Sequence, residues 1–202
     1  MYHDATHTPP LINFKEVKEN SFIYINKNAL AKDICREMIR RFESDKESQY
    51  RGRTGQNFKE NYNVKMSTDL AISAHEHWQD ITQELLRSLS SSLREFSGTF
   101  PFFKGRFKDI GYNLQRTDEG EYYNWHIDGG SHDFADRQLV ALWYLNDVDG
   151  PGGATEFMYQ DIAIQPEEGA LVLFPPFWTH EHRNSQLQKG VKYVATTWIS
   201  FA

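Results

Sequence analysis

The sequence predicts a mainly β protein with flanking helices (α+β class), in which a β-sandwich or barrel of the jelly-roll type is packed by N-terminal helices. From about Arg106 onward, short β-forming runs alternate with Asp- and Gly-containing breaks. Before that point, apolar residues recur at helical spacing. A length of 202 residues fits one domain, residues 1–202, with a helical support region at about 20–100 and a β-core at about 106–202.

The N-terminal half is expected to form one short strand and two helices. Residues 22–25 are an apolar β-forming run, and Asn28 is a candidate cap for a helix over residues 29–44. Residues 45–66 are polar and contain glycine, which predicts a long mobile loop. Residues 68–96 are predicted to be helical, because Leu85, Leu89 and Leu93 fall on one stripe.

The C-terminal half reads as a series of short strands. The breaks between them carry turn residues such as Asp-Gly-Gly and Glu-Glu-Gly. Many short strands at this spacing favour two packed antiparallel sheets, with the helices on one outer face. The predicted strands are residues 110–116, 122–127, 139–145, 154–157, 162–165, 170–174 and 193–201.

The composition disfavours two classes of partner, nucleic acids and membranes. The net charge of −6 disfavours nucleic acid and anionic membranes, because both are bound by clustered Lys and Arg. No run of 18 apolar residues is present, so no membrane span is expected, and the first ten residues do not resemble a signal peptide. Cys35 is the single cysteine, which suits a reducing, cytoplasmic location. The oligomeric state is left open.

A His-x-Asp tripeptide, His126 to Asp128, suggests a metal site. If this segment is a strand, the two side chains point to the same face. A third imidazole from elsewhere in the chain would complete a 2-His-1-carboxylate facial triad, which is typical of non-haem Fe(II).

Two later histidines, His180 and His182, are candidates for that third ligand. They would share a strand face, so strand geometry does not separate them. Ten residues after His182 comes Lys192, at the start of a β-forming run. A buried cation there would bind the far carboxylate of a dicarboxylate whose other end chelates the metal, as 2-oxoglutarate does.

Further motifs follow in a fixed order and carry a resemblance to a known family. They are Gly120-x-x-Tyr123-x-x-His126-x-Asp128, Tyr144-Leu145-Asn146, Gly152-Gly153-Ala154-Thr155, Pro166-x-x-Gly169, His182, Gly190-x-Lys192 and Trp198. Over residues 106–202 the chain resembles the prolyl 4-hydroxylase group of Fe(II)- and 2-oxoglutarate-dependent dioxygenases, in particular small microbial and phage members. The resemblance implies a double-stranded β-helix, which is a distorted jelly roll.

The resemblance also implies roles for individual residues. His126, Asp128 and one later histidine would hold Fe(II) and act in catalysis, and the family spacing to Lys192 favours His182 over His180. Lys192 would pair with the distal carboxylate of 2-oxoglutarate. Two further residues would lie near this co-substrate, Tyr144 and Thr117, the latter where the family often has tyrosine.

For the substrate, the resemblance points to a prolyl residue in a peptide or protein. Arg137 and Trp198 match positions near it, and Trp143, Trp178 and Tyr123 are aromatic side chains that would pack on a proline ring. The role of residues 45–66 is left open between a solvated loop and a lid that closes over the peptide, as such a loop does in family members.

The implied reaction consumes dioxygen, yields succinate and CO2, and in this family uses ascorbate. Two alternatives stay open. One is an oxygenase of the same fold acting on a free amino acid or another side chain. The other is a non-catalytic β-barrel that binds a metal or a ligand.

Overall fold

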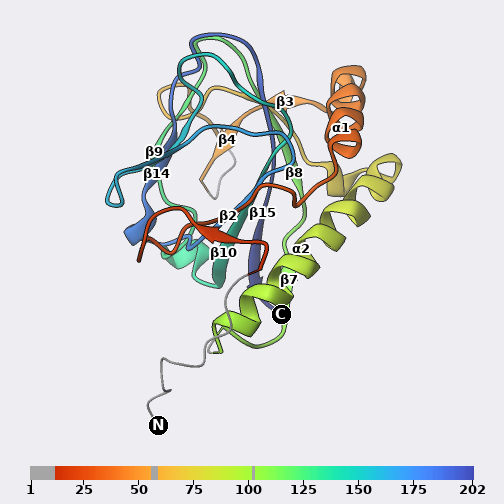
Figure 1. Ribbon diagram of the computed structural model, residues 1–202. Helices are drawn as coiled ribbons and strands as arrows, with labels where there is room; N and C mark the ends of the chain where they lie inside the picture. Colours follow the sequence, from red (N-terminus) through yellow and green to blue (C-terminus); the bar gives the residue numbers. More distant parts are fainter. Residues whose placement is uncertain (1–11, 56–58, 102) are drawn as a thin grey trace.

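The computed structural model describes residues 12–55, 59–101 and 103–202. Two antiparallel sheets face each other, and two helices cover the outer face of the larger sheet (Figure 1). This is the arrangement that the sequence predicts. No helix of the described residues is both long and apolar enough to cross a membrane.

The larger sheet has a central group of four strands that is extended on both sides by strands from the N-terminal half. Its order is β1 (Lys15–Glu16), β2 (Tyr24–Asn26), β13 (Leu171–Phe174), β10 (Arg137–Tyr144), β15 (Lys192–Phe201), β8 (Asn113–Thr117), β6 (Thr68–Leu70) and β3 (Tyr50–Arg51), with β7 (Phe107–Asp109) also paired to β15.

The smaller sheet has the order β12 (Ile162–Ile164), β11 (Thr155–Phe157), β14 (His182–Asn184) and β9 (Tyr123–His126). A separate hairpin joins β4 (Arg53–Thr54) to β5 (Lys59–Glu60). Strands β9 and β14, which carry His126 and His182, are neighbours in this sheet although they lie far apart in the sequence.

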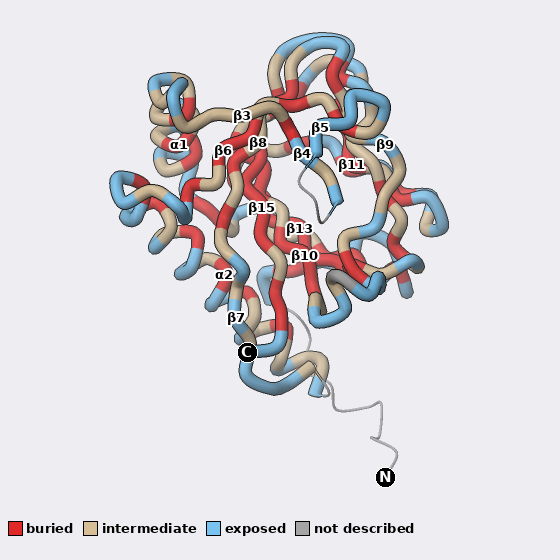
Figure 2. The backbone as a smooth tube through the Cα atoms, turned by 180° about the vertical axis from the view of Figure 1, so that it is seen from behind, coloured by how far each residue is buried: buried red, intermediate tan, exposed pale blue. Residues whose placement is uncertain are grey.

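Strand β10 shows how the two hydrophobic cores are separated. Leu139, Ala141 and Trp143 point outward into the core beneath the helices, whereas Val140 and Tyr144 point inward between the sheets. This alternation follows from the two-residue period of a strand. Both faces of β10 are therefore buried, and Figure 2 shows this strand in red at the centre of the molecule.

Helices α1 (Lys32–Ser44) and α2 (Gln79–Thr99) supply the outer core. Cys35, Met38 and Phe42 of α1 are fully or almost fully buried, as are Ile81 and Leu85 of α2. The spacing of these residues places them on one helix face. Five 3-10 helices complete the described chain: η2 (Lys46–Ser48), η3 (Ile72–Ala74), η4 (Glu76–Trp78), η5 (His132–Phe134) and η6 (Trp178–His180).

Three predictions about the N-terminal half are wrong. The first helix begins after Ala31 rather than Asn28. The segment from residue 68 is not α-helical until Gln79. Thr68–Leu70 pairs with β8 as strand β6, and the chain then passes through the short 3-10 helices η3 and η4. Residues 45–66 are not one irregular loop in their described part. They contain η2 and strands β3 to β5, and the backbone from Val64 to Met66 bonds to residues 122–124 beside β9.

Candidate metal centre and adjoining cavity

The β9–β14 pair brings the predicted metal ligands together. His126 and His182 are direct partners across the two strands. Asp128 follows β9, where its N–H donates to the carbonyl oxygen of Pro176 at 3.0 Å. One ligand atom from each of His126, Asp128 and His182 lies within 4.8 Å of the others. Within the described residues, this is the one His, Cys, Asp and Glu cluster with metal-ligand spacing.

Backbone carbonyls fix the orientation of both imidazoles. His126 Nδ1 lies 2.7 Å from the carbonyl oxygen of Asn124, and His182 Nδ1 lies 2.9 Å from that of His180. A carbonyl oxygen only accepts, so Nδ1 of each ring carries the proton and donates. Nε2 is thus the ring atom that each histidine offers to a metal, and His182 Nε2 lies 3.4 Å from Asp128 Oδ2. Both rings thus hold the tautomer that a metal requires.

Aromatic side chains pack against the imidazole rings of His126 and His182. The ring of Tyr123 stacks on His126 with centroids 3.6 Å apart and an angle of 9°. Phe157 and Phe174 pack against His182 at 5.6 Å and 4.8 Å. These contacts restrict ring rotation, so the ligand positions are set before any metal binds.

The charges of the cluster favour metal-binding protonation states. Burial lowers the pKa of His126 to about 3, and the neighbouring His182 adds to this effect. Burial alone would raise the pKa of Asp128, but the contact with His182 and the charge of the Arg137 guanidinium hold it below its usual range. The imidazole of His126 is therefore neutral and the carboxyl group of Asp128 is ionised near neutral pH.

His180 does not join the cluster. It ends η6, a short helix rather than a strand, and its buried ring donates from Nε2 to the carbonyl oxygen of Ser21 at 2.9 Å. Its Nδ1 lies 2.9 Å from Thr179 Oγ1. The ring of His180 thus links the segment just before β14 to the β1–β2 hairpin. This geometry favours His182 as the third ligand.

A cavity adjoins the cluster and is lined by all three of its residues. It lies between the two sheets, and Lys192 is 3% exposed at its wall. The Lys192 ammonium donates to Asn184 Oδ1 at 2.6 Å and to the carbonyl oxygen of Gly153 at 2.7 Å. Burial lowers the pKa of Lys192 to about 7. Among the described residues, no carboxylate pairs with this ammonium.

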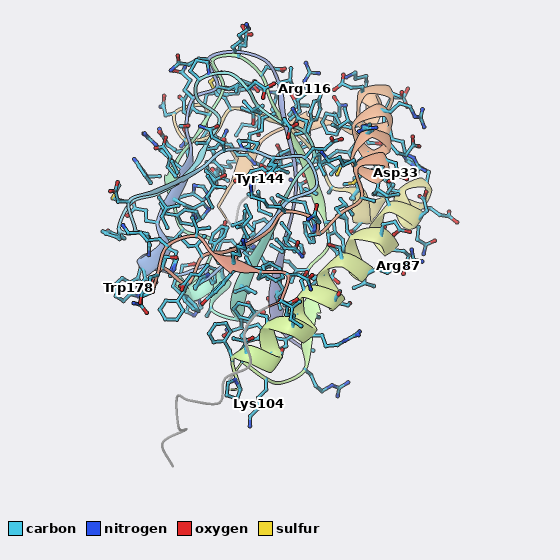
Figure 3. The ribbon with its side chains drawn as sticks, viewed as in Figure 1. Asp33, Arg87, Lys104, Arg116, Tyr144 and Trp178 are labelled. Carbon is cyan, nitrogen blue, oxygen red and sulfur yellow. The ribbon has the colours of Figure 1, made fainter. Side chains whose placement is uncertain are left out.

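The two other residues predicted to contact a co-substrate also lie near Lys192. Thr117 is buried on β8, directly across from Lys192 on β15, and lines the cavity. Tyr144 is fully buried, with its ring centroid 5.3 Å from Lys192 Nζ (Figure 3). Its hydroxyl donates to Thr155 Oγ1 at 2.7 Å, and it is Thr155 that reaches the cavity wall.

Arg137 and Trp198 lie at the opposite side of the ligand cluster. The guanidinium of Arg137 donates to the carbonyl oxygen of Asp128 at 2.7 Å and stacks 4.1 Å from the Trp198 ring. Burial lowers the pKa of Arg137. A second cavity shares Asp128, Tyr123 and Trp198 with the first and extends to Tyr50.

Two of the three proposed proline-packing aromatics do not reach the site. Trp143 is buried beneath α2, where its Nε1 donates to Ser88 Oγ at 3.0 Å. Trp178 is 71% exposed at the edge of the molecule (Figure 3). Trp143 is thus a core residue and Trp178 a rim residue, because aromatic character alone does not tell which face of an element a residue occupies. Tyr123 does line both cavities.

Sequence reasoning missed two features of the wall. Lys65 and Asp69 form a buried ion pair at 2.7 Å, and Lys65 Nζ lies 5.1 Å from the Tyr123 ring centroid. Asn184, the partner of Lys192, follows His182 by two residues on β14. The period of two would have placed Asn184 beside the metal ligand, had this three-residue strand been recognised.

The donor set fits a first-row transition metal. Two imidazoles, from β9 and β14, and one carboxylate, from the turn after β9, leave one side open toward the cavity, which is the facial-triad arrangement. A metal held there would face the uncompensated ammonium of Lys192.

Comparison with known proteins agrees with this geometry. Residues 112–200 match the model of the 2OG-Fe(II) oxygenase superfamily. Over these residues the resemblance to Fe(II)- and 2-oxoglutarate-dependent oxygenases is confirmed. No curated protein sequence matched the chain.

Solved structures show the same fold at low sequence identity. A viral collagen prolyl hydroxylase from Paramecium bursaria Chlorella virus-1 in complex with 2OG is 17% identical, with a TM-score of 0.66 over 93% of this chain and 99% of that one. A prolyl hydroxylase from Trichoplax adhaerens, in complex with a hypoxia inducible factor peptide fragment, is 16% identical, with a TM-score of 0.75 over 90% and 84%. A Pseudomonas putida prolyl-4-hydroxylase is 15% identical, with a TM-score of 0.65 over 90% and 93%. The fold is thus a double-stranded β-helix with flanking helices.

Proposed function

We propose that this chain is an Fe(II)- and 2-oxoglutarate-dependent dioxygenase that hydroxylates a prolyl residue in a peptide or protein, with succinate and CO2 as co-products. One observation carries the proposal. The facial triad of His126, Asp128 and His182 opens into the same cavity as the ammonium of Lys192, which has no carboxylate partner among the described residues. A molecule with a chelating 2-oxoacid end and a distal carboxylate satisfies both requirements at once.

The residues of this chain would bind and orient the reactants. Fe(II), held by the triad, would supply the activation of dioxygen that is coupled to decarboxylation of 2-oxoglutarate. Lys192 would pair with the distal carboxylate of 2-oxoglutarate, and the Thr117 hydroxyl would donate a hydrogen bond to the same carboxylate. The face of the Tyr144 ring would stabilise the Lys192 ammonium. The apolar walls between the sheets, including Val140 and Phe174, would exclude water.

The second cavity suits the substrate because it reaches the triad from the side of Arg137 and Trp198. Both residues are held in place, Arg137 by the Asp128 carbonyl oxygen and by stacking on Trp198. The similar structure from Trichoplax adhaerens was solved with a peptide fragment bound. We therefore propose a polypeptide substrate, with Arg137 and Trp198 beside the reacting residue.

Mass spectrometry tests the reaction. The purified protein is incubated with Fe(II), 2-oxoglutarate, ascorbate and a panel of prolyl peptides. The expected product is a peptide that has gained one oxygen atom, formed together with succinate. His182→Ala should abolish both products and metal binding. His180→Ala, a matched control in the same turn, should still bind iron, and loss of iron in this variant alone would overturn the assignment of His182.

Other outcomes identify the alternatives. Oxygen transfer to a free amino acid or to a side chain other than proline would indicate a different oxygenase of the same fold. Bound iron without any turnover would indicate a binding module. A requirement for ascorbate and a cytoplasmic location stay predictions.

A further inference from the structure

Asn184 lies between the metal ligand His182 and the carboxylate anchor Lys192. Residues 182 and 184 of strand β14 point to the same face, and both line the cavity. Across the sheet, Asn184 is the direct partner of Thr155 on β11. The side chain thus extends from the same strand as the metal ligand toward the anchor.

The contact between Asn184 and Lys192 has only one chemically possible direction. An ammonium donates and never accepts, so the amide must turn Oδ1 toward Lys192, at 2.6 Å. The other acceptor is the carbonyl oxygen of Gly153, at 2.7 Å. Gly153 has a positive φ of 73°, a backbone conformation that favours glycine and that other residues adopt only with strain.

Both acceptors are neutral, and this has an electrostatic consequence. They hold the ammonium in a defined direction through two of its three N–H groups, but they do not balance its charge. A carboxylate at position 184 would make an equally short contact and would also form an internal ion pair. The choice of an amide leaves the charge of Lys192 available to a ligand.

We propose that Asn184 is a positioning residue for the co-substrate, because its neutral oxygen orients Lys192 without neutralising it and so reserves the ammonium for the distal carboxylate of 2-oxoglutarate. This inference rests on the proposed function. It predicts that the charge of residue 184, rather than its shape or its hydrogen bond, controls the affinity for 2-oxoglutarate.

Two substitutions of nearly equal size separate the electrostatic role from a structural one. Asn184→Asp keeps the shape and the hydrogen bond to Lys192 but adds a negative charge. Asn184→Leu keeps the approximate volume but removes the acceptor. If Asn184 only held the wall together, the aspartate would be the milder change and the leucine the more harmful one.

The electrostatic proposal reverses that order. Asn184→Asp should weaken 2-oxoglutarate binding by about 100-fold, because the ammonium is already paired and the new charge repels the ligand. Asn184→Leu should weaken it by about 10-fold, because one hydrogen bond to the cation is lost. Neither variant should change the affinity for Mn(II), since the triad is intact. Gln188→Glu makes the same amide-to-acid change at an exposed position and should bind as the parent does.

Isothermal titration calorimetry on the Mn(II)-loaded full chain measures these affinities, with 2-oxoglutarate as the probe. Glutarate, which has the distal carboxylate but no chelating 2-oxoacid, is a second probe and should show the same order of variants. A parent protein that does not bind 2-oxoglutarate would refute the proposed function and this inference with it. A parent that binds, together with an Asn184→Asp variant that binds as tightly as the parent or more tightly than Asn184→Leu, would refute the positioning role alone.

Discussion

Replacing Lys192 by methionine should change how the stability of the protein depends on pH. Lys192 is 3% exposed, and burial lowers its pKa from the ordinary 10.5 to about 7. Between these two values the unfolded chain carries a proton on this side chain that the folded chain lacks. Stability rises with pH wherever the unfolded state binds more protons. The parent should therefore become more stable from neutral to alkaline pH through this residue, whereas methionine has no proton to lose.

The size of the effect follows from the two pKa values. Over this window the free energy of unfolding of the parent, minus that of Lys192→Met, should rise by up to ~1.4 kcal/mol per pH unit. From pH 7.5 to pH 9.5 the increase amounts to about 2.5 kcal/mol. The lost contacts to Asn184 and Gly153 add a constant that does not depend on pH. Other titrating groups are the same in both chains and cancel in the difference.

Urea denaturation without 2-oxoglutarate at several pH values in this window measures that difference. Lys108→Met is the matched control, because Lys108 is exposed on β7, and its difference from the parent should stay constant. A constant difference for Lys192→Met as well would mean that Lys192 keeps its proton in the folded protein. That result would refute the claim that burial leaves this charge uncompensated.

Adding the ligand extends the same test to function. With Mn(II) and saturating 2-oxoglutarate, the distal carboxylate should keep Lys192 protonated in the folded state, as an opposite charge at close range does. The dependence on pH described above should then disappear. If it persists although the ligand is bound, the carboxylate does not pair with Lys192.

Three other predictions concern the rest of the chain. Asp69→Asn leaves the buried Lys65 ammonium without a charge partner and should lower the free energy of unfolding by ~3–5 kcal/mol, measured by urea denaturation. The double variant Lys65→Met with Asp69→Leu buries no charge at this site and should regain most of the lost stability. Burial raises the pKa of Cys35 to about 12, so iodoacetamide should label the unfolded chain but not the native one, as mass spectrometry would show. Gly152→Ala should lower the melting temperature clearly, because Gly152 has a positive φ of 83° and a Cβ there would clash with the carbonyl oxygen of Gln186. Gly98→Ala should leave the melting temperature unchanged, because a Cβ at that position of α2 meets open space.

The sequence predicted the inner strands well because their pattern is local. Residues 139–145 were expected as a strand, and β10 spans Arg137–Tyr144. Residues 170–174 correspond in the same way to β13, Leu171–Phe174. Both strands are buried on two faces, so each is a continuous apolar run bounded by turn residues.

The short strands were missed because distant partners create them. Thr68–Leu70 forms a strand only because β8 lies beside it, and residues 64–66 are ordered by bonds to residues 122–124. His182–Asn184 is extended because β9 and β11 flank it. None of these segments has enough local preference to be recognised alone, since tertiary context overrides propensity in short elements.

The residues of the site divide in the same way, into those that a local sequence pattern reveals and those that only contacts between distant segments reveal. His126 and Asp128 were identified by their spacing and Lys192 by its place at the start of a β-forming run, whereas only the family resemblance favoured His182 over His180. The structure brings all four to one cavity. Asn184 carries no such signal, because an asparagine two residues after a histidine has no meaning until β14 and β15 are known to converge.

Because β14 and β15 converge, two residues of β14 would act at the two ends of one bound ligand. In β14, His182 and Asn184 project from the same face roughly 6.6 Å apart, the rise of two residues in a strand. His182 belongs to the metal end of the cavity, and Asn184 directs the ammonium at the other end. The separation between the two ends is therefore set by backbone geometry rather than by flexible side chains. A co-substrate recognised by this cavity must match a fixed length as well as carry a charge, and these two requirements together select a short dicarboxylate over a monocarboxylate of the same size.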